Sequence, residues 1–100
     1  MKTFEQVLGI FSEYLAVDPD FEVVMISRGY TVLGWDNHTR NWATAEYCGT
    51  PESLCNALAC AYADYTEVKI TGGNREATLE ELEKINVECE RLKECCKQNP

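Results

Sequence analysis

The stretch Phe21–Tyr47, FEVVMISRGYTVLGWDNHTRNWATAEY, decides the fold, because the chain changes there from helical to extended character. β-Branched and aromatic residues become frequent, and turn-forming pairs such as Arg28-Gly29 and Asp36-Asn37 interrupt them. We predict three strands, at Phe21–Ser27, Tyr30–Asp36 and Asn41–Tyr47. One tight turn and one longer turn join them, and consecutive strands with short loops form an antiparallel meander.

The side chains of the first two strands alternate between the two faces of the predicted sheet. In the first strand apolar residues point to both faces, as Val23 and Val24 do. We therefore expect this strand to be central or covered on both faces. In the second strand Leu33 and Trp35 share one face, while Tyr30 and Val32 share the other.

Before these strands, residues Thr3–Val17 have the period of an amphipathic helix. Its apolar positions are Phe4, Leu8, Phe11 and Leu15. Thr3 with Gln6 is a capping box that begins the helix, and Pro19 disfavours helix at the residue before it. The sequence thus predicts one helix that ends before the first strand.

A second helix begins at Thr50-Pro51-Glu52, where a cap, a first-turn proline and an acid coincide, and ends at Gly72-Gly73. One side carries Leu54, Ala57, Leu58, Ala61, Tyr65 and Val68. Residues 57–63 are apolar almost all round, so we expect this helix to be buried under a neighbour or in an interface between copies.

A third helix begins at the capping box of Thr78 and Glu81 and runs to about Lys97. We predict that it packs through Leu82, Ile85, Cys89 and Leu92. Its polar face predicts the ion pairs Glu80–Lys84, Glu88–Arg91 and Glu90–Lys93. The expected architecture is one α+β domain over residues 1–100, in the order α-β-β-β-α-α, with a three-stranded antiparallel meander covered by helices on one side.

Composition excludes several classes of protein. The chain has 100 residues, 45% of them hydrophobic, which is too many for a disordered chain. Its formal net charge of -8 argues against nucleic acid or an anionic membrane as a direct partner. Residues 1–74 hold 10 acids and 4 bases, a net charge of -6, so most of the excess lies there.

Six cysteines in so short a chain suggest disulfides at first sight. Glu5 and Glu13 interrupt any apolar run near the N-terminus, so we expect no secretion signal and place the protein in the reducing cytoplasm. No C-x-x-C motif is present, so the cysteines predict neither a zinc site nor a redox dithiol. We interpret them as packing residues and expect no cofactor.

His38 is the only histidine, and any Cys-His or Ser-His-Asp constellation would need it. It lies in a predicted turn, and no nucleophile-elbow, P-loop or zincin motif accompanies it. We therefore expect no enzyme, and keep a small-molecule or catalytic site around His38 and Arg40, with Trp35 and Trp42 beside them, as an alternative.

The aromatic residues of the hairpin favour an interaction surface, because apolar patches left uncovered on a domain are often binding sites. The candidate surface is Tyr30, Val32, Trp35, His38, Arg40 and Trp42. The leading hypothesis is a non-enzymatic protein-interaction module that binds a protein partner or itself as a homo-oligomer. An alternative is an acidic mimic of nucleic acid that inhibits a nuclease or another DNA-processing enzyme.

Five segments of the sequence support a family resemblance. They are Phe-Glu-Val-Val at 21–24, Arg-Gly-Tyr-Thr-Val-Leu-Gly-Trp-Asp at 28–36, Thr-Pro-Glu-Ser-Leu-Cys-Asn-Ala-Leu at 50–58, Lys-Ile-Thr-Gly-Gly at 69–73 and Thr-Leu-Glu-Glu at 78–81. With these segments the chain resembles small uncharacterised proteins encoded on conjugative and other mobile elements of gut Firmicutes. The resemblance implies a bacterial cytoplasmic protein accessory to mobile DNA, with no known activity and no catalytic residues.

Overall fold

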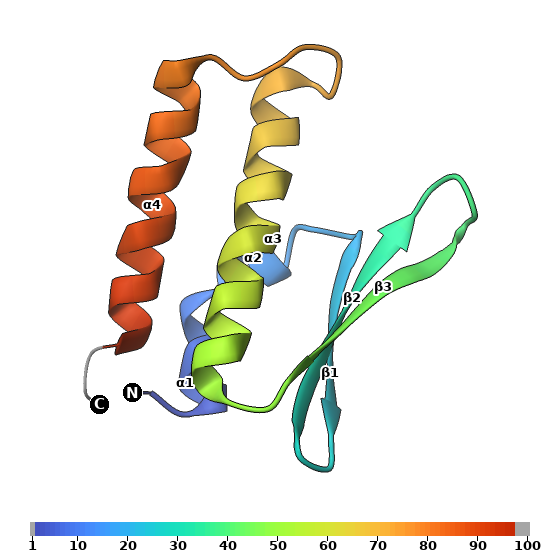
Figure 1. The fold of residues 1–100 in the computed structure, drawn as a ribbon, viewed down its shortest axis with the longest axis vertical. Coiled ribbons are helices and arrows are strands. Elements are labelled where there is room, and N and C mark those ends of the chain that lie inside the picture. The colour runs from blue at the N-terminus through green and yellow to red at the C-terminus, as the bar shows by residue number, and fades with distance from the viewer. Residues whose placement is uncertain (1, 98–100) are drawn as a thin grey trace.

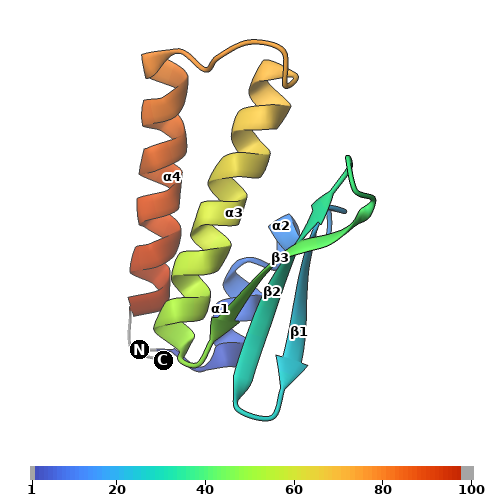
Figure 2. The same cartoon turned by 45° about the vertical axis from the view of Figure 1, so that its right-hand side comes forward.

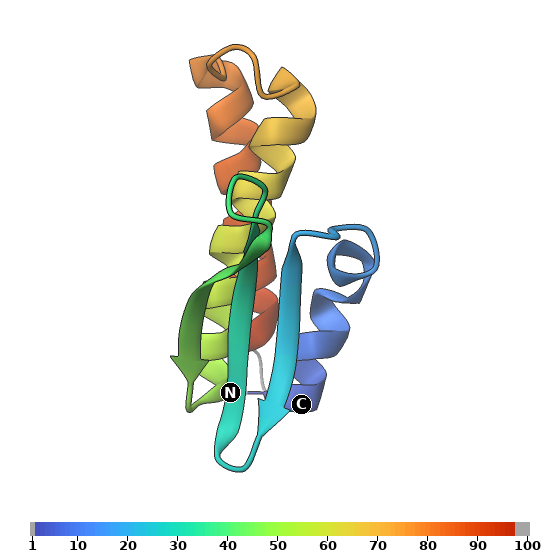
Figure 3. The same cartoon turned by 90° about the vertical axis from the view of Figure 1, so that its right-hand side faces the viewer.

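The computed structural model describes residues 2–97, which form a mixed α+β fold. In chain order the elements are α1 (Phe4–Ile10), α2 (Ser12–Leu15), β1 (Phe21–Ile26), β2 (Gly29–Asp36), β3 (Asn41–Cys48), α3 (Pro51–Thr71) and α4 (Leu79–Lys97). The strands form one antiparallel sheet of three, in the order β1-β2-β3. The predicted meander is confirmed, and Figures 1 and 3 show all helices on one side of the sheet.

The N-terminal helical region is divided, so the prediction of one helix over Thr3–Val17 is wrong. Phe11 separates α1 from α2 with φ of -98° and ψ of 11°, and its side chain is only 1% exposed. Gly9, a poor helix former, lies two residues before the break. Tertiary packing contributes more to the stability of a short helix than its intrinsic helix propensity does. We therefore attribute the break to the burial of the Phe11 ring in the core.

The predicted helix caps are present. Thr50 accepts a hydrogen bond from the backbone N–H of Ser53 at the start of α3, and Pro51 occupies the first turn. The helix ends at Gly72, whose φ of +71° lies in the left-handed region that favours glycine. The other confirmed caps are the capping boxes of Thr3 with Gln6 and Thr78 with Glu81.

β1 lies at the edge of the sheet, so the prediction that it is central or covered on both faces is wrong. Only the middle strand of a three-stranded meander has two neighbours, and that strand is β2. The helices cover one face, and the end of β1 extends past them. The side chains of Val24, Met25 and Ile26 are therefore 39%, 73% and 41% exposed.

The main core lies between α1, the middle of the sheet and the first half of α3. Leu54 and Leu58 are fully buried there, as the sequence predicts. The second half of α3 extends with α4 beyond the sheet (Figure 2), and Val68 is 58% exposed. The expected burial of this helix is therefore confirmed for its first half only, because the sheet diverges from α3 toward the helix C-terminus.

α4 packs along α3 through the predicted seam. Ile85, Cys89 and Leu92 are buried, but Leu82 is 36% exposed, so the seam prediction is wrong at that position. Leu82 lies beside the loop that follows α3, where no further turn of helix covers it. The three predicted ion pairs on the polar face of α4 are all present.

Candidate binding cleft

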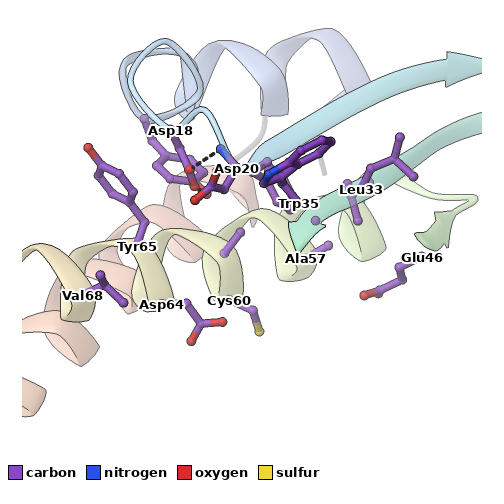
Figure 4. Close-up of a pocket in the computed structure, with 15 residues that line it drawn as sticks. Asp18, Asp20, Leu33, Trp35, Glu46, Ala57, Cys60, Asp64, Tyr65 and Val68 are labelled. Atoms are coloured by element: carbon purple, nitrogen blue, oxygen red, sulfur yellow. Dashed lines mark hydrogen bonds between the residues drawn. The ribbon is translucent and has the colours of Figure 1, made fainter. Parts of the chain in front are cut away.

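A cleft of about 440 Å³ opens between α3, the sheet and the loop before β1 (Figure 4). Its lining combines acidic, aromatic and small apolar side chains. The lining residues are Tyr14, Asp18, Asp20, Phe21, Val32, Leu33, Gly34, Trp35, Glu46, Ala57, Cys60, Ala61, Asp64, Tyr65 and Val68. Four separate stretches of the chain, within residues 14–21, 32–35 and 57–68 and at Glu46, therefore meet at the cleft.

α3 contributes one of its faces to the cleft. The lining positions run from Ala57 to Val68 at spacings of three and four residues, which is the helical repeat. Ala57 and Ala61 have short side chains, so the helix does not fill the space between itself and the sheet. Asp64 and Tyr65 also line the cleft from α3 where the sheet diverges, with the Tyr65 ring on the side of the helix toward Asp18 and the Asp64 carboxylate on the other side (Figure 4).

Hydrogen bonds hold the loop between α2 and β1 against the sheet. The carboxylate of Asp18 accepts one bond from the Tyr14 hydroxyl at 2.5 Å and another from the Asp20 backbone N–H at 2.9 Å. The carbonyl of Asp20 in turn accepts a bond from the backbone N–H of Trp35 at 2.8 Å. Asp18 and Asp20 are thus held in place at the rim of the cleft.

Tyr14 is the centre of an aromatic cluster at one end of the cleft. Its ring centroid lies 6.1 Å from that of Phe21 and 5.6 Å from that of Tyr65. Burial raises the pKa of the Tyr14 hydroxyl well above its usual range, and the hydrogen bond to Asp18 raises it further. The hydroxyl therefore stays protonated and remains a hydrogen-bond donor to Asp18.

The cleft is acidic. Asp18, Asp20, Glu46 and Asp64 line it, and none of its lining residues within the described chain is a lysine or an arginine. All four ion pairs found in residues 2–97 lie between Arg75 and Lys93, in the C-terminal part of the chain. Within the described residues the acids before Arg75 thus form no ion pair, and four of the ten acids of residues 1–74 line one hollow.

The carboxylates do not converge on one point. Among the described residues no group of three or more His, Cys, Asp or Glu side chains is placed to hold a metal ion. The acids come from a loop, from β3 and from α3, so they lie at different sides of the cleft. Such an arrangement suits several separate cationic groups better than one small ion.

The six residues predicted as an interaction surface lie in three places, the core, the cleft and the end of the β2–β3 hairpin. Tyr30 and Val32 are 9% and 4% exposed and belong to the core, so the prediction is wrong for them. The alternation along β2 turns both toward the helices, where the Tyr30 ring lies 5.1 Å from that of Phe4. Of the six, Trp35 and Val32 line the cleft, and only Trp35 is partly exposed there.

The other three predicted residues lie at the end of the β2–β3 hairpin. His38 and Arg40 are exposed in its turn, and Arg40 has a positive φ of 55°. The Trp42 ring packs edge-on against Trp35, with centroids 5.2 Å apart. Neither His38 nor Arg40 lines the cleft, so the structure separates them from its carboxylates.

The cysteines are free thiols, and most of them are core residues. Cys48, Cys55, Cys89 and Cys96 are buried, and Cys60 is exposed at the cleft. Burial, together with a hydrogen bond to Cys96, raises the pKa of the Cys55 thiol to about 12. The packing interpretation of the cysteines on the last helix is confirmed for Cys89 and Cys96.

Alkylation of the folded protein is expected to modify Cys60 first and to leave Cys55 unmodified. The thiolate is the reactive species, so a raised pKa and burial both slow the reaction at Cys55. Mass spectrometry after brief treatment with iodoacetamide at neutral pH measures this order, and the same treatment in urea is the control that exposes all six thiols. Rapid modification of Cys55 without urea would contradict the packing of α3 against α4.

The acidic cleft was only partly evident from the sequence. The charge count places the acidic excess in residues 1–74, and the helical spacing places Ala57, Ala61, Tyr65 and Val68 on one side of α3. Nothing local in the sequence indicates that Asp18 and Glu46 lie across from that side. The divergence of the sheet from α3, which opens the cleft, depends on tertiary packing.

Comparisons of the chain with protein-family models, with curated proteins and with solved structures found no match. The resemblance to proteins of mobile elements therefore stays a prediction. No helix among the described residues combines the length and the apolar character that crossing a membrane requires.

Proposed function

We propose that this chain is a protein-interaction module whose cleft binds a basic segment of a partner protein. The single observation that supports this function best is the composition of the cleft, with four carboxylates, four aromatic side chains and no cation among its lining residues in the described chain. Unpaired carboxylates attract lysine and arginine, and they do so more strongly inside a hollow, where the field is focused.

The aromatic side chains favour the same kind of partner. Lysine and arginine bind the faces of aromatic rings, and their aliphatic stems cover apolar surface. Tyr65 already makes one such contact, since Nζ of Lys69 lies 5.9 Å from its ring centroid. Tyr14, Phe21 and Trp35 offer further aromatic surface around the cleft, and Ala57 and Ala61 leave room for aliphatic stems.

A protein segment fits the cleft better than the other candidate ligands. A nucleic-acid mimic requires acids that project outward along a ridge, whereas these carboxylates surround a hollow. A site at His38 would lie on an exposed turn, outside the cleft. Carboxylates from several elements suit a segment with more than one basic residue.

Binding of an amidated tetra-arginine peptide is expected to change the tryptophan fluorescence, because Trp35 lines the cleft. Asp64→Asn is expected to weaken this binding about fivefold, roughly 1 kcal/mol, through the loss of one carboxylate. Asp64 has no ion-pair partner within residues 2–97, so its removal leaves the fold intact. Fluorescence titration at fixed ionic strength gives both dissociation constants.

The matched control is Glu94→Gln, which removes the same charge from an exposed position on α4. It is expected to change the dissociation constant less than twofold, because long-range charge effects are screened by salt. Equal effects of Asp64→Asn and Glu94→Gln would show that the peptide binds net charge and not the cleft. Absence of saturable binding would overturn the proposal.

A further inference from the structure

We propose that two copies of this chain pair through β1, antiparallel about a two-fold axis at Met25, and so form one continuous six-stranded sheet. The proposal concerns the opposite edge of the sheet from β3 and does not depend on the cleft. It rests on the unpaired edge of β1, on the order of its charges and on a groove beside it.

The edge of β1 is open for backbone pairing. β1 pairs with β2 on one side, and no other backbone hydrogen bond within residues 2–97 reaches Phe21–Ile26. Every second residue of an edge strand directs its N–H and C=O away from the sheet. β1 also lacks the lysines, prolines and bulges that protect edge strands, and its last four residues are Val-Val-Met-Ile.

The charges around β1 are self-complementary in one register. Glu22 and Arg28 are the charged residues of the segment from Phe21 to Gly29, and each lies three positions from Met25. Antiparallel pairing about Met25 joins Val24–Ile26 of the two copies within the strand and brings Glu22 of each copy opposite Arg28, in the turn that follows β1, of the other. The same register pairs Val24 with Ile26 across the interface, on the outer face of the sheet.

A groove on the helix side of the sheet lies next to this edge. It has a volume of about 330 Å³ and is lined largely by apolar side chains, including Leu8, Leu15, Phe21 and Val23. Figure 3 shows α1 beside β1 on this side of the sheet. Val23 and Met25 share the inner face, so Met25 of the second copy would lie diagonally across from Val23 and cover the end of the groove.

A second copy explains the composition of β1 better than an unrelated strand does. The strand has apolar side chains on both faces, as central strands have, yet in one chain it lies at the edge and Met25 is 73% exposed. Pairing with its own copy gives β1 a neighbour on each side. A two-fold interface requires a self-complementary surface, and the placement of Glu22 and Arg28 provides one.

Light scattering coupled to size exclusion tests the pairing. The wild type is expected to elute with twice the 11.3 kDa mass of the chain at high micromolar concentration. Met25→Lys places two like charges at the axis and is expected to weaken the dimer at least a hundredfold. Val87→Lys, on an exposed apolar residue of α4, is the matched control and is expected to leave the dimer intact.

A charge exchange tests the register. Glu22→Lys changes the net charge from -8 to -6 and would strengthen association if only overall repulsion mattered. The substitution removes both Glu22–Arg28 pairs of the dimer, and this loss is instead expected to weaken association on the order of tenfold. Glu94→Lys makes the same change of charge on α4 and is not expected to weaken it. The double variant Glu22→Lys, Arg28→Glu is expected to restore the wild-type dissociation constant.

Two results would overturn the proposal. One is a monomeric wild type at every concentration tested, and the other is a dimer that Met25→Lys leaves unchanged. Circular dichroism of each variant confirms that the fold is retained, which the exposure of Met25, Glu22 and Arg28 favours. The carbonyl of Arg28 keeps its bond from the Tyr47 hydroxyl in the charge-exchanged variant, since that contact involves the backbone.

Discussion

Replacing Leu58 with alanine is expected to lower the free energy of unfolding by about 3 kcal/mol. Leu58 is fully buried in the first half of α3, where it belongs to the core shared with α1 and the sheet. The substitution removes its apolar contacts and leaves a cavity that close-packed neighbours fill only in part. For a domain of this size the melting temperature should fall by about 15 °C.

Urea unfolding followed by far-ultraviolet circular dichroism measures this loss. The matched control is Val87→Ala, which shortens an apolar side chain that is 65% exposed on α4. Exposed truncations change stability little, and we expect less than about 0.5 kcal/mol here. A loss below about 1 kcal/mol for Leu58→Ala would mean that α3 does not present this face to the core.

Replacing Gly29 with alanine is expected to lower the free energy of unfolding by about 3 kcal/mol and to disturb the β1–β2 hairpin. Gly29 has a φ of +129°, a conformation that residues with a side chain rarely adopt. An added Cβ would also lie 2.4 Å from the carbonyl oxygen of Cys48. That oxygen belongs to the backbone of β3, so it moves only if the strand moves.

Gly9→Ala is the control for this substitution, and its expected effect has the opposite sign. Gly9 lies on the exposed side of α1, and an added Cβ meets no atom within 4 Å. Alanine favours helix over glycine, so stability is expected to rise by about 0.5 to 1 kcal/mol. If both variants had the same stability in urea, the close approach of Gly29 to Cys48 would be contradicted.

Much of the secondary structure was predictable because its causes are local. The cap of Thr50 and the left-handed Gly72 bracket α3, and both depend on residues within one turn of the helix. The ion pair of Glu80 with Lys84 depends only on helical spacing. The strands were predicted to within about one residue at each end for the same reason, since turns at Arg28-Gly29 and Asn37–Arg40 separate them.

Predictions that required knowledge of neighbouring elements were less successful. Alternation correctly placed Tyr30 and Val32 on one face of β2. It did not hold for Trp35, because the strand pairing is irregular between Gly34 and Trp35, and Trp35 lines the cleft together with Val32. It could not indicate which face the helices cover, so core residues were assigned to a surface. The end of α1 before Phe11 was also missed because it depends on tertiary contacts. Helical periodicity shows that Phe11 is apolar, but it does not show how the ring packs in the core.

The sequence by itself determined the order and type of the elements apart from the break at Phe11, the caps that bound the helices, and the location of the acidic excess in residues 1–74. Only the tertiary structure decided that β1 is an edge strand and that Asp18, Glu46 and Asp64 surround one cleft. The physical reason is the range of the interactions. Caps and turns act over a few residues, whereas the cleft joins groups 18 or more positions apart, which only the packing of α3 against the sheet brings together.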